Sequence, residues 1–262
     1  MKLRTDFTSR DDLSRYVSET FGTSGDPSPD FTGGRTEALR RLHSFSLHGY
    51  AAKRNLTEVS AVSMLSPYIR HGVMTLAEVR RFVLGKFGQG KDTYKFIFEL
   101  AWRHFFQLVY AASGDKIYRD METGKTGVSK YDGILPQDVA EARTGLRCMD
   151  YFMQKLLATG YLHNHERMWF ASYLVHHRRV DWLVGERLFY KHLIDGDPAS
   201  NALSWQWVAS TFSAKPYIFN KEVLERCTDG VHCKVCEVKE SCPFNFPPGV
   251  LEERLFGKRF EQ

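Results

Sequence analysis

The spacing of apolar side chains predicts a chain built mainly from helices. Apolar residues return three and four positions apart over long stretches, whereas the strict alternation that marks half-buried strands is scarce. The fold class predicted from this pattern is all-α. The predicted helices begin at Thr36, where Leu39, Leu42, Phe45 and Leu47 share an apolar face, and continue over 93–112, 147–158, 164–177, 184–193 and 250–256.

Two stretches interrupt the helical pattern. Residues 22–34 hold four glycines and two prolines, which favours a flexible joint, and 113–142 are rich in Gly, Lys and Asp, as loops are. We therefore expect an N-terminal segment and joint over 1–34 and one helical domain over 35–262. The 49 residues before Tyr50 are too few for an additional nucleotide-binding α/β domain.

The composition is that of an ordinary globular protein, with 43% hydrophobic and 26% charged residues among 262. The net charge of +5 permits a polyanionic partner but falls short of the strongly basic surface of many nucleic-acid binders. Residues 1–13 lack the apolar core of a signal peptide, and no apolar run approaches the ~20 residues that span a bilayer. We therefore expect a cytoplasmic protein with no membrane segment.

Polar and aromatic side chains gather between positions 195 and 207. Asp195 and Asp197 supply carboxylates, Asn201 an amide, and Trp205 and Trp207 indoles. Carboxylates and amides hydrogen-bond polar heterocycles, while indoles stack on flat rings and can pass single electrons. The same residues also suit a solvated turn followed by core tryptophans, so this stretch alone leaves both interpretations open.

Two other segments carry candidate ligand contacts. A helix start at Pro67 with Ser66 as its cap would offer N–H groups and hydroxyls to an anion such as a pyrophosphate, although an ordinary cap has the same sequence. One face of the helix predicted over 93–112 carries Glu99, Trp102, Arg103 and Phe106. That face suits a ligand wall or an exposed surface with one buried Trp.

Four of the five cysteines lie near the C-terminus. In a reducing compartment this grouping indicates metal or cluster ligation rather than disulfides. Spacing alone favours the local set of Cys227, Cys233, Cys236 and Cys242, with tetrahedral zinc or an iron–sulfur cluster as the bound group.

Taken together, these motifs resemble the FAD-binding domain of the DNA photolyase and cryptochrome family, from about Tyr50 to Asn220. The family usually has an N-terminal α/β antenna domain, for which this chain has no counterpart, so it resembles a short form. The motifs that carry the resemblance are Thr144-Gly145, 159–164 with Arg167-Met168, Asp181-Trp182 with Gly185-Glu186, and 195–197 leading to 205–210.

The resemblance implies a U-shaped FAD inside a helical bundle. Arg167 and Asp195 would pair beside the isoalloxazine, Asp197 would face the ribityl or pyrimidine edge, and Asn201 would lie near N5. Tyr50 and 62–66 would hold the phosphates, with one hydroxyl lost because Val62 replaces a threonine common in the family. The full set implied for FAD is Tyr50, Val62, Ser63, Met64, Leu65, Ser66, Phe96, Arg103, Arg167, Asp195, Asp197 and Asn201.

The resemblance also implies a lesion pocket for a flipped pyrimidine dimer, in which indoles stack on the bases and polar groups bond the carbonyls. Arg103 would contact a DNA phosphate or help to position Glu99. Members specific for (6-4) products carry His at positions 164 and 168, so that activity is disfavoured here. The implied catalytic residues are Glu99, Trp102, Asn164, Met168 and Trp207.

An electron relay and an iron–sulfur site follow from the same resemblance. Trp205 and Trp182 match the two inner tryptophans of the family's relay, but the outer one has no counterpart, so photoreduction should be slow or rerouted through Tyr118, Tyr131 or Trp169. The iron–sulfur branch of the family has Cys-x2-Cys before Cys-Pro-Phe-Asn and a fourth ligand before the His-Asn turn. The implied [4Fe–4S] ligands are Cys148, Cys233, Cys236 and Cys242, with Cys227 spare.

The function implied is repair of cyclobutane pyrimidine dimers in DNA by light-driven electron transfer from reduced FAD, carried out by a monomer. The alternative is a cryptochrome-like blue-light sensor, or a flavin and iron–sulfur redox protein without repair activity. A third possibility is a role in nucleic-acid binding or assembly without photochemistry.

Overall fold

The computed structural model describes residues 2–22, 28, 30–59 and 61–260. Over these residues the chain is helical without strands, apart from one isolated bridge between Asp132 and Val180, which confirms the all-α prediction. The predicted joint at 22–34 lies partly outside the described residues. The helices are α1 (Arg10–Phe21), α2 (Arg35–Ser44), α3 (Tyr50–Lys53), α4 (Ser66–Arg70), α5 (Leu76–Phe87), α6 (Lys91–Ser113), η1 (Gly114–Tyr118), α7 (Gln137–Ala140), α8 (Arg147–Thr159), α9 (Asn164–Ser172), η2 (Tyr173–His177), α10 (Trp182–His192), α11 (Pro198–Ala209), α12 (Lys221–Cys227) and α13 (Pro248–Phe256).

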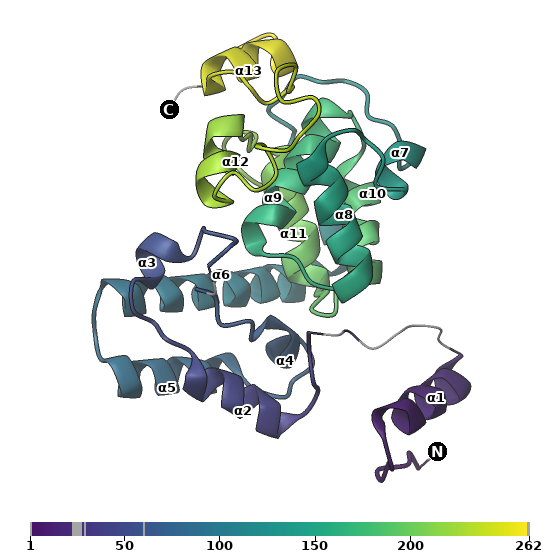
Figure 1. The fold of residues 1–262 in the computed structure, drawn as a ribbon, viewed down its shortest axis with the longest axis vertical. Helices are drawn as coiled ribbons and strands as arrows, with labels where there is room; N and C mark the ends of the chain where they lie inside the picture. The colour runs from purple at the N-terminus through teal and green to yellow at the C-terminus, as the bar shows by residue number, and fades with distance from the viewer. Residues whose placement is uncertain (1, 23–27, 29, 60, 261–262) are drawn as a thin grey trace.

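The buried apolar side chains form two clusters. The first comes from α2 to α6 and includes Leu42, Val79 and Phe96, while the larger second cluster comes from α8 to α12 and their connections. Figure 1 shows α2 to α6 as one group of helices and α7 to α13 as another, with α1 apart from both. Helix α6 packs against α3, α5 and α11 and so joins the two groups. The polar residues discussed below lie along this junction.

Local sequence explains how α11 is placed. Asp197 caps its first turn by accepting a hydrogen bond from the Ser200 N–H, and Pro198 supplies a helical φ without losing a needed donor. Helix α10 then packs directly on α11 because Gly185 has no side chain. A Cβ at position 185 would lie 2.2 Å from Cη2 of Trp205.

Several predicted elements differ from the structure. Ser66 is the first residue of α4 rather than its cap, and Leu65 at the cap position makes no side-chain bond. The helix predicted over 164–177 changes to a π-helical turn at Tyr173. The loop predicted over 113–142 contains the short helices η1 and α7.

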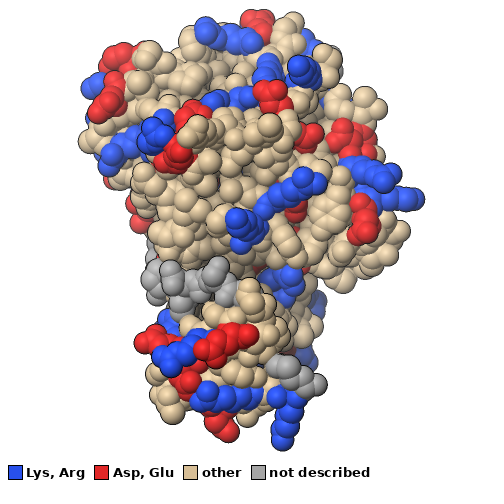
Figure 2. Space-filling model, turned by 90° about the vertical axis from the view of Figure 1, so that its right-hand side faces the viewer, with Lys and Arg blue, Asp and Glu red and all other residues tan. Residues whose placement is uncertain are grey.

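Charged side chains of both signs are interspersed over the face seen in Figure 2, with uncharged surface between them. This pattern agrees with the modest net charge of +5. Within the described residues, none of the helices is long and apolar enough to cross a bilayer.

Candidate functional site

A cavity of about 240 Å³ opens where α6, α9, α10 and α11 meet. Ser66 at the start of α4 and the turn Asp195–Asp197 before α11 also line it. The predicted site residues that line it are Ser66, Arg103, Asn164, Arg167, Met168, Asp195, Asp197, Asn201 and Trp205.

An ion pair lies in the wall of this cavity. Arg167 donates from Nη2 to Oδ2 of Asp195 at 2.9 Å and from Nε to the Leu162 carbonyl at 2.9 Å, so the predicted pairing is present. Asp195 is 5% exposed, and its Oδ1 has no hydrogen-bond partner among the described residues, as is also true of Ser200 Oγ. Buried oxygens without partners are costly, so the wall is suited to a ligand that carries N–H or O–H groups.

Asp197 is fixed from three sides. It accepts hydrogen bonds from the Ser200 N–H at 2.8 Å, from Gln107 Nε2 at 2.8 Å and from Arg103 Nη2 at 3.2 Å. Burial lowers the pKa of Arg103, and the nearby Asp197 and Asp195 carboxylates oppose this shift. Gln107 was not predicted, although it lies one turn after Arg103 and that spacing could have identified it.

Asn201 is oriented by Glu186. Its Nδ2 donates both to the Glu186 carbonyl at 2.8 Å and to Glu186 Oε1 at 2.9 Å. Burial raises the pKa of Glu186, which was not predicted as a site residue. Because both amide protons are used, the side chain has only its carbonyl oxygen to offer a ligand, and that oxygen is a hydrogen-bond acceptor.

The residues predicted for a lesion pocket are only partly brought together. Asn164 Nδ2 lies 3.3 Å from Met168 Sδ, and both side chains line the cavity. Trp102 and Trp207 are 45% and 37% exposed and lie outside the cavity wall. Their exposed indoles leave flat apolar surfaces open to solvent.

Glu99 is held differently from the expectation. It accepts hydrogen bonds from the Tyr50 hydroxyl at 2.5 Å and from Arg54 Nε at 2.8 Å, whereas Arg103 reaches Asp197 instead. Arg54 was missed because it lies 45 residues away in sequence. Burial raises the pKa of the Tyr50 hydroxyl, with the Glu99 charge adding to the effect, so this phenol stays protonated as a donor.

Most residues expected at the FAD phosphates lie outside the cavity wall, as does Phe96 of the wider FAD set. Tyr50 and Phe96 are buried in the first cluster with ring centroids 5.3 Å apart. Ser66 lines the cavity, whereas the preceding residues 62–65 lie outside its wall.

The two expected relay tryptophans are both buried. Trp205 lines the cavity, with its ring centroid 4.9 Å from that of Phe189. Trp182 donates from Nε1 to Asp120 Oδ1 at 2.7 Å. The Asp132 N–H donates to the Arg179 carbonyl at 2.7 Å, and this bond draws the segment after Tyr131 alongside the start of α10.

Of the remaining relay candidates, Tyr118 is half-buried, and burial raises its pKa to about 12. Trp169 is fully buried against Phe152 and Phe219.

A second, smaller pocket brings four cysteines together: Cys148, Cys233, Cys236 and Cys242. Cys227 lies outside this pocket, and its carbonyl accepts a hydrogen bond from the Thr57 N–H at 2.9 Å. Burial raises the pKa of the Cys148 thiol, as do Cys233 and Cys242 beside it. All five cysteines of the described chain are free thiols, and no group of three or more His, Cys, Asp or Glu in that part is placed to hold a single metal ion.

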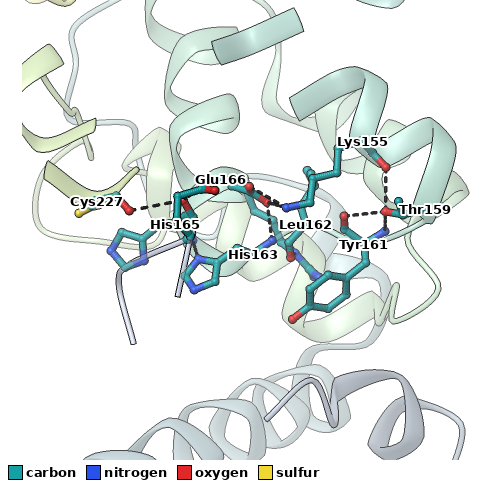
Figure 3. Close-up of polar contacts among 11 residues, drawn as sticks. Lys155, Thr159, Tyr161, Leu162, His163, His165, Glu166 and Cys227 are labelled. Carbon is teal, nitrogen blue, oxygen red and sulfur yellow. Dashed lines mark hydrogen bonds and ion pairs between the residues drawn. The ribbon is translucent and has the colours of Figure 1, made fainter. Parts of the chain in front are cut away.

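The start of α9 is fixed by a polar network, seen in Figure 3. Lys155 Nζ donates to both Glu166 oxygens at 2.8 and 2.9 Å, and Glu166 accepts from the His163 N–H at 2.7 Å. His163 Nδ1 in turn accepts from the His165 N–H. This capping arrangement sets the direction of α9, and therefore where Asn164 and Arg167 enter the cavity.

Comparisons with known proteins identify relatives of this chain. The family described as the FAD binding domain of DNA photolyase matches residues 96–231. A deoxyribodipyrimidine photo-lyase of Alkalihalophilus pseudofirmus is 35% identical over 71% of this chain and 40% of its own length. A cryptochrome DASH of Oryza sativa is 31% identical over 71% of this chain and 34% of its own length.

A solved structure is also similar. The archaeal photolyase of Sulfolobus tokodaii matches with a TM-score of 0.70 and 27% identity over 93% of this chain and 54% of that chain. The chain thus spans less than half the length of the two curated relatives it matches. On the family match and the identity to its relatives, the chain belongs to the family of the FAD-binding domain of DNA photolyase.

Proposed function

We propose that this chain binds FAD in the polar cavity and uses light to split cyclobutane pyrimidine dimers in DNA. The family supports FAD as the ligand, and a relative 35% identical carries the name deoxyribodipyrimidine photo-lyase. The observation that carries the proposal is the pair of buried oxygens, Asp195 Oδ1 and Ser200 Oγ, which have no partner among the described residues. A polar ring system bound there would satisfy them.

The residues that would hold the flavin are Arg167, Asp195, Asp197 and Asn201, with Ser66 toward the phosphates. Bound and reduced, FAD would supply a light-excited one-electron donor. Arg167 and Asp195 neutralise each other, so they would present donors and acceptors to the rings without a net charge. Asn201 would accept a hydrogen bond from a ring N–H, because Glu186 occupies both of its own amide protons.

The lesion would enter beside the flavin site. Asn164 and Met168 line the cavity, so a flipped dimer could meet their amide and thioether. Trp102 and Trp207 would stack on its bases from the solvent side, since both indoles are exposed. Glu99, held by Tyr50 and Arg54, would donate to a base carbonyl when protonated or accept from a base N–H when ionised.

We further propose that Cys148, Cys233, Cys236 and Cys242 hold a [4Fe–4S] cluster, with Cys227 outside the set. The support is that these four thiols line one pocket. A single tetrahedral zinc ion would need its sulfurs roughly 3.8 Å apart, as Zn–S bonds of about 2.3 Å dictate. A [4Fe–4S] cluster, with an iron at each thiolate, spaces its four ligand sulfurs farther apart than a single ion does.

A repair assay tests the main proposal. Fully reduced protein is illuminated with blue light together with oligonucleotides that carry one thymine dimer, single-stranded or paired, and dimer loss is measured. Asn164→Ala should repair more slowly, whereas Gln154→Ala, which removes an exposed amide on α8, should match the parent. The proposal fails if the reduced parent removes dimers from neither substrate and Asn164→Ala shows the same lack of dimer loss.

The second candidate is a cryptochrome-like light sensor, or a flavin and iron–sulfur redox protein. The 31% identity to a cryptochrome DASH and the lack of an outer relay tryptophan favour it. It would show light-dependent flavin reduction without repair, and its affinity for DNA would be the same with or without a dimer.

A further inference from the structure

The wall of the cysteine pocket contains a buried imidazole as well as its four thiols. His232 lines the pocket, directly precedes Cys233 in sequence and is 5% exposed. Its Nε2 is buried and has no hydrogen-bond partner among the described residues. An unpaired polar nitrogen in such surroundings is costly, and a group bound in the pocket could satisfy it.

The ring of His232 is held in place by α8. Its centroid lies 4.7 Å from that of Tyr151 and 5.4 Å from that of Phe152. These two residues follow Cys148 by three and four positions, and side chains at that spacing are neighbours on a helix surface. The imidazole therefore lies one helical turn from Cys148 and next to Cys233, two of the four proposed cluster ligands.

Packing alone does not account for a histidine at this position. Between two aromatic rings, a phenylalanine would fill a similar volume without burying a ring nitrogen. At Nε2 a histidine supplies either an N–H donor or a lone pair that can bind a metal. The residue thus offers the pocket a polar atom that packing does not require.

The other polar groups of the wall indicate that the pocket needs a donor. Lys221 and Lys239 line it as well, and none of the described residues in its wall carries a carboxylate. The four thiolates of the proposed cluster outweigh the positive charge of its iron–sulfur core, so cations and N–H groups complement the occupied pocket. Cysteines already supply all four ligands, which leaves the imidazole the role of a hydrogen-bond donor.

We propose that His232 donates from Nε2 to a sulfur atom of the cluster and thereby raises its reduction potential. The inference rests on the proposed [4Fe–4S] cluster, whose surroundings it specifies. A hydrogen bond to sulfur strengthens when the cluster gains an electron, because the added negative charge makes sulfur a better acceptor. The bond therefore stabilises the reduced form more than the oxidised form. His232 acts as a positioning residue and lies outside the wall of the flavin cavity.

The test is a redox titration of the anaerobically purified protein in the dark, followed by EPR of the reduced cluster. His232→Phe retains a ring beside Tyr151 and Phe152 but removes the N–H. The reduction equilibrium of the cluster should shift about tenfold toward the oxidised form, which is about 59 mV for one electron. Iron and sulfide content should stay at parent levels, because the four cysteines remain.

Two variants accompany His232→Phe. His232→Gln places an amide N–H near the position of Nε2 and should recover most of the lost potential. His104→Phe, which replaces an exposed imidazole on α6, is the control and should keep the parent potential.

A second measurement needs no variant. When the histidine ring nitrogens of the parent carry the heavier nitrogen isotope, pulsed EPR of the reduced cluster should show the weak nitrogen coupling of a hydrogen-bonded imidazole. The absence of any coupling overturns the inference. A strong coupling, as from a nitrogen bonded directly to iron, overturns it too, because His232 would then replace a cysteine as ligand.

These measurements separate the role of His232 from the proposed cluster. A parent that contains neither iron nor sulfide refutes the cluster and the role of His232 with it. A parent cluster whose potential is unchanged in His232→Phe refutes the role of His232 alone. Neither result depends on repair, since no light or DNA is used.

Discussion

The half-buried Arg167 and the buried Asp195 form an ion pair in which only one carboxylate oxygen is used. Arg167 Nη2 donates to Oδ2 at 2.9 Å, and Oδ1 has no partner in the described part of the chain. The pair is neutral overall and leaves one acceptor oxygen unused on a residue that lines the cavity. Such a wall suits a ligand that carries N–H or O–H groups.

Asp195→Asn tests this relationship. The substitution keeps the shape but leaves the Arg167 charge uncompensated, and removing one partner of a buried pair is strongly destabilising. FAD affinity should fall by about 30-fold, equivalent to about 2 kcal/mol, as read from flavin content and titration of apoprotein. Asp138→Asn, which breaks a bidentate pair with Arg178 at α7, is the control and should keep full flavin content.

Gly185→Ala tests the packing of α10 on α11. The new Cβ would meet Trp205 ring atoms at 2.2, 2.4 and 2.8 Å, and this indole is buried at 2% exposure, so the two helices must shift apart or the ring must turn into the cavity. The free energy of unfolding should fall by about 2–3 kcal/mol in urea titrations. Gly133→Ala, where a Cβ meets nothing within 4 Å, should be close to neutral, and equal losses in both variants would contradict this account.

The relay and the lesion face can be separated through Trp205 and Trp207. Trp205→Phe retains a ring in the cavity wall but removes the readily oxidised indole, so flavin photoreduction should slow by at least about tenfold while chemically reduced protein repairs normally. Trp207→Ala should leave photoreduction unchanged and weaken binding of dimer-containing DNA, because its indole is exposed rather than lining the cavity. Transient absorption measures the first effect, and affinity for dimer-containing DNA measures the second.

Stability should decrease on acidification because the π-helical turn contains the buried His176 and the half-buried His177. Burial lowers the pKa of His177 to about 4 and that of His176 to about 3, against 6.5 when solvated. The unfolded chain therefore binds protons first, so this stability is complete above about pH 6.5 and decreases toward pH 4. The loss should be about 1–2 kcal/mol per histidine at pH 5. His177→Phe should shrink the difference in unfolding free energy between pH 7 and pH 5, and an unchanged difference would count against the assignment.

Periodicity predicted α8, α9 and α10 because each has one apolar face. Helix α11 was not predicted, since residues on all its sides are buried, including the polar Asn201 and Gln206, and no amphipathic pattern remains. Helix α5 was also missed, although Thr75 and Glu78 form the capping box that marks its start.

Contacts between residues of the family's motifs could be predicted from the sequence. Contacts with residues outside those motifs and far away in sequence could not. The pairing of Arg167 with Asp195 followed from the family resemblance. The partner of Glu99 could not be predicted in this way. Arg103, its neighbour on α6, bonds to Asp197 instead, and Arg54 at the end of α3 bonds to Glu99. Sequence spacing on one helix does not reveal such competition between long-range ion pairs.

The two candidate sets of cysteine ligands differ in one member, which is either Cys148 or Cys227. Cys148 shares a pocket with Cys233, Cys236 and Cys242, whereas Cys227 lies outside it at the end of α12. Closely placed buried thiols lose their protons readily only when a metal compensates the charge, so the four should be most stable as cluster ligands. Cys148→Ser should therefore lose most of its iron and acid-labile sulfide.

Cys227→Ser is the matched control, since it alters an equally buried thiol on the neighbouring helix and should keep parent levels of iron and sulfide. Metal analysis of anaerobically purified protein checks both variants, with zinc measured in the same samples. Iron retained in Cys148→Ser but lost in Cys227→Ser would move the site to the local set of cysteines. Stoichiometric zinc without sulfide in the parent would replace the cluster by a single ion.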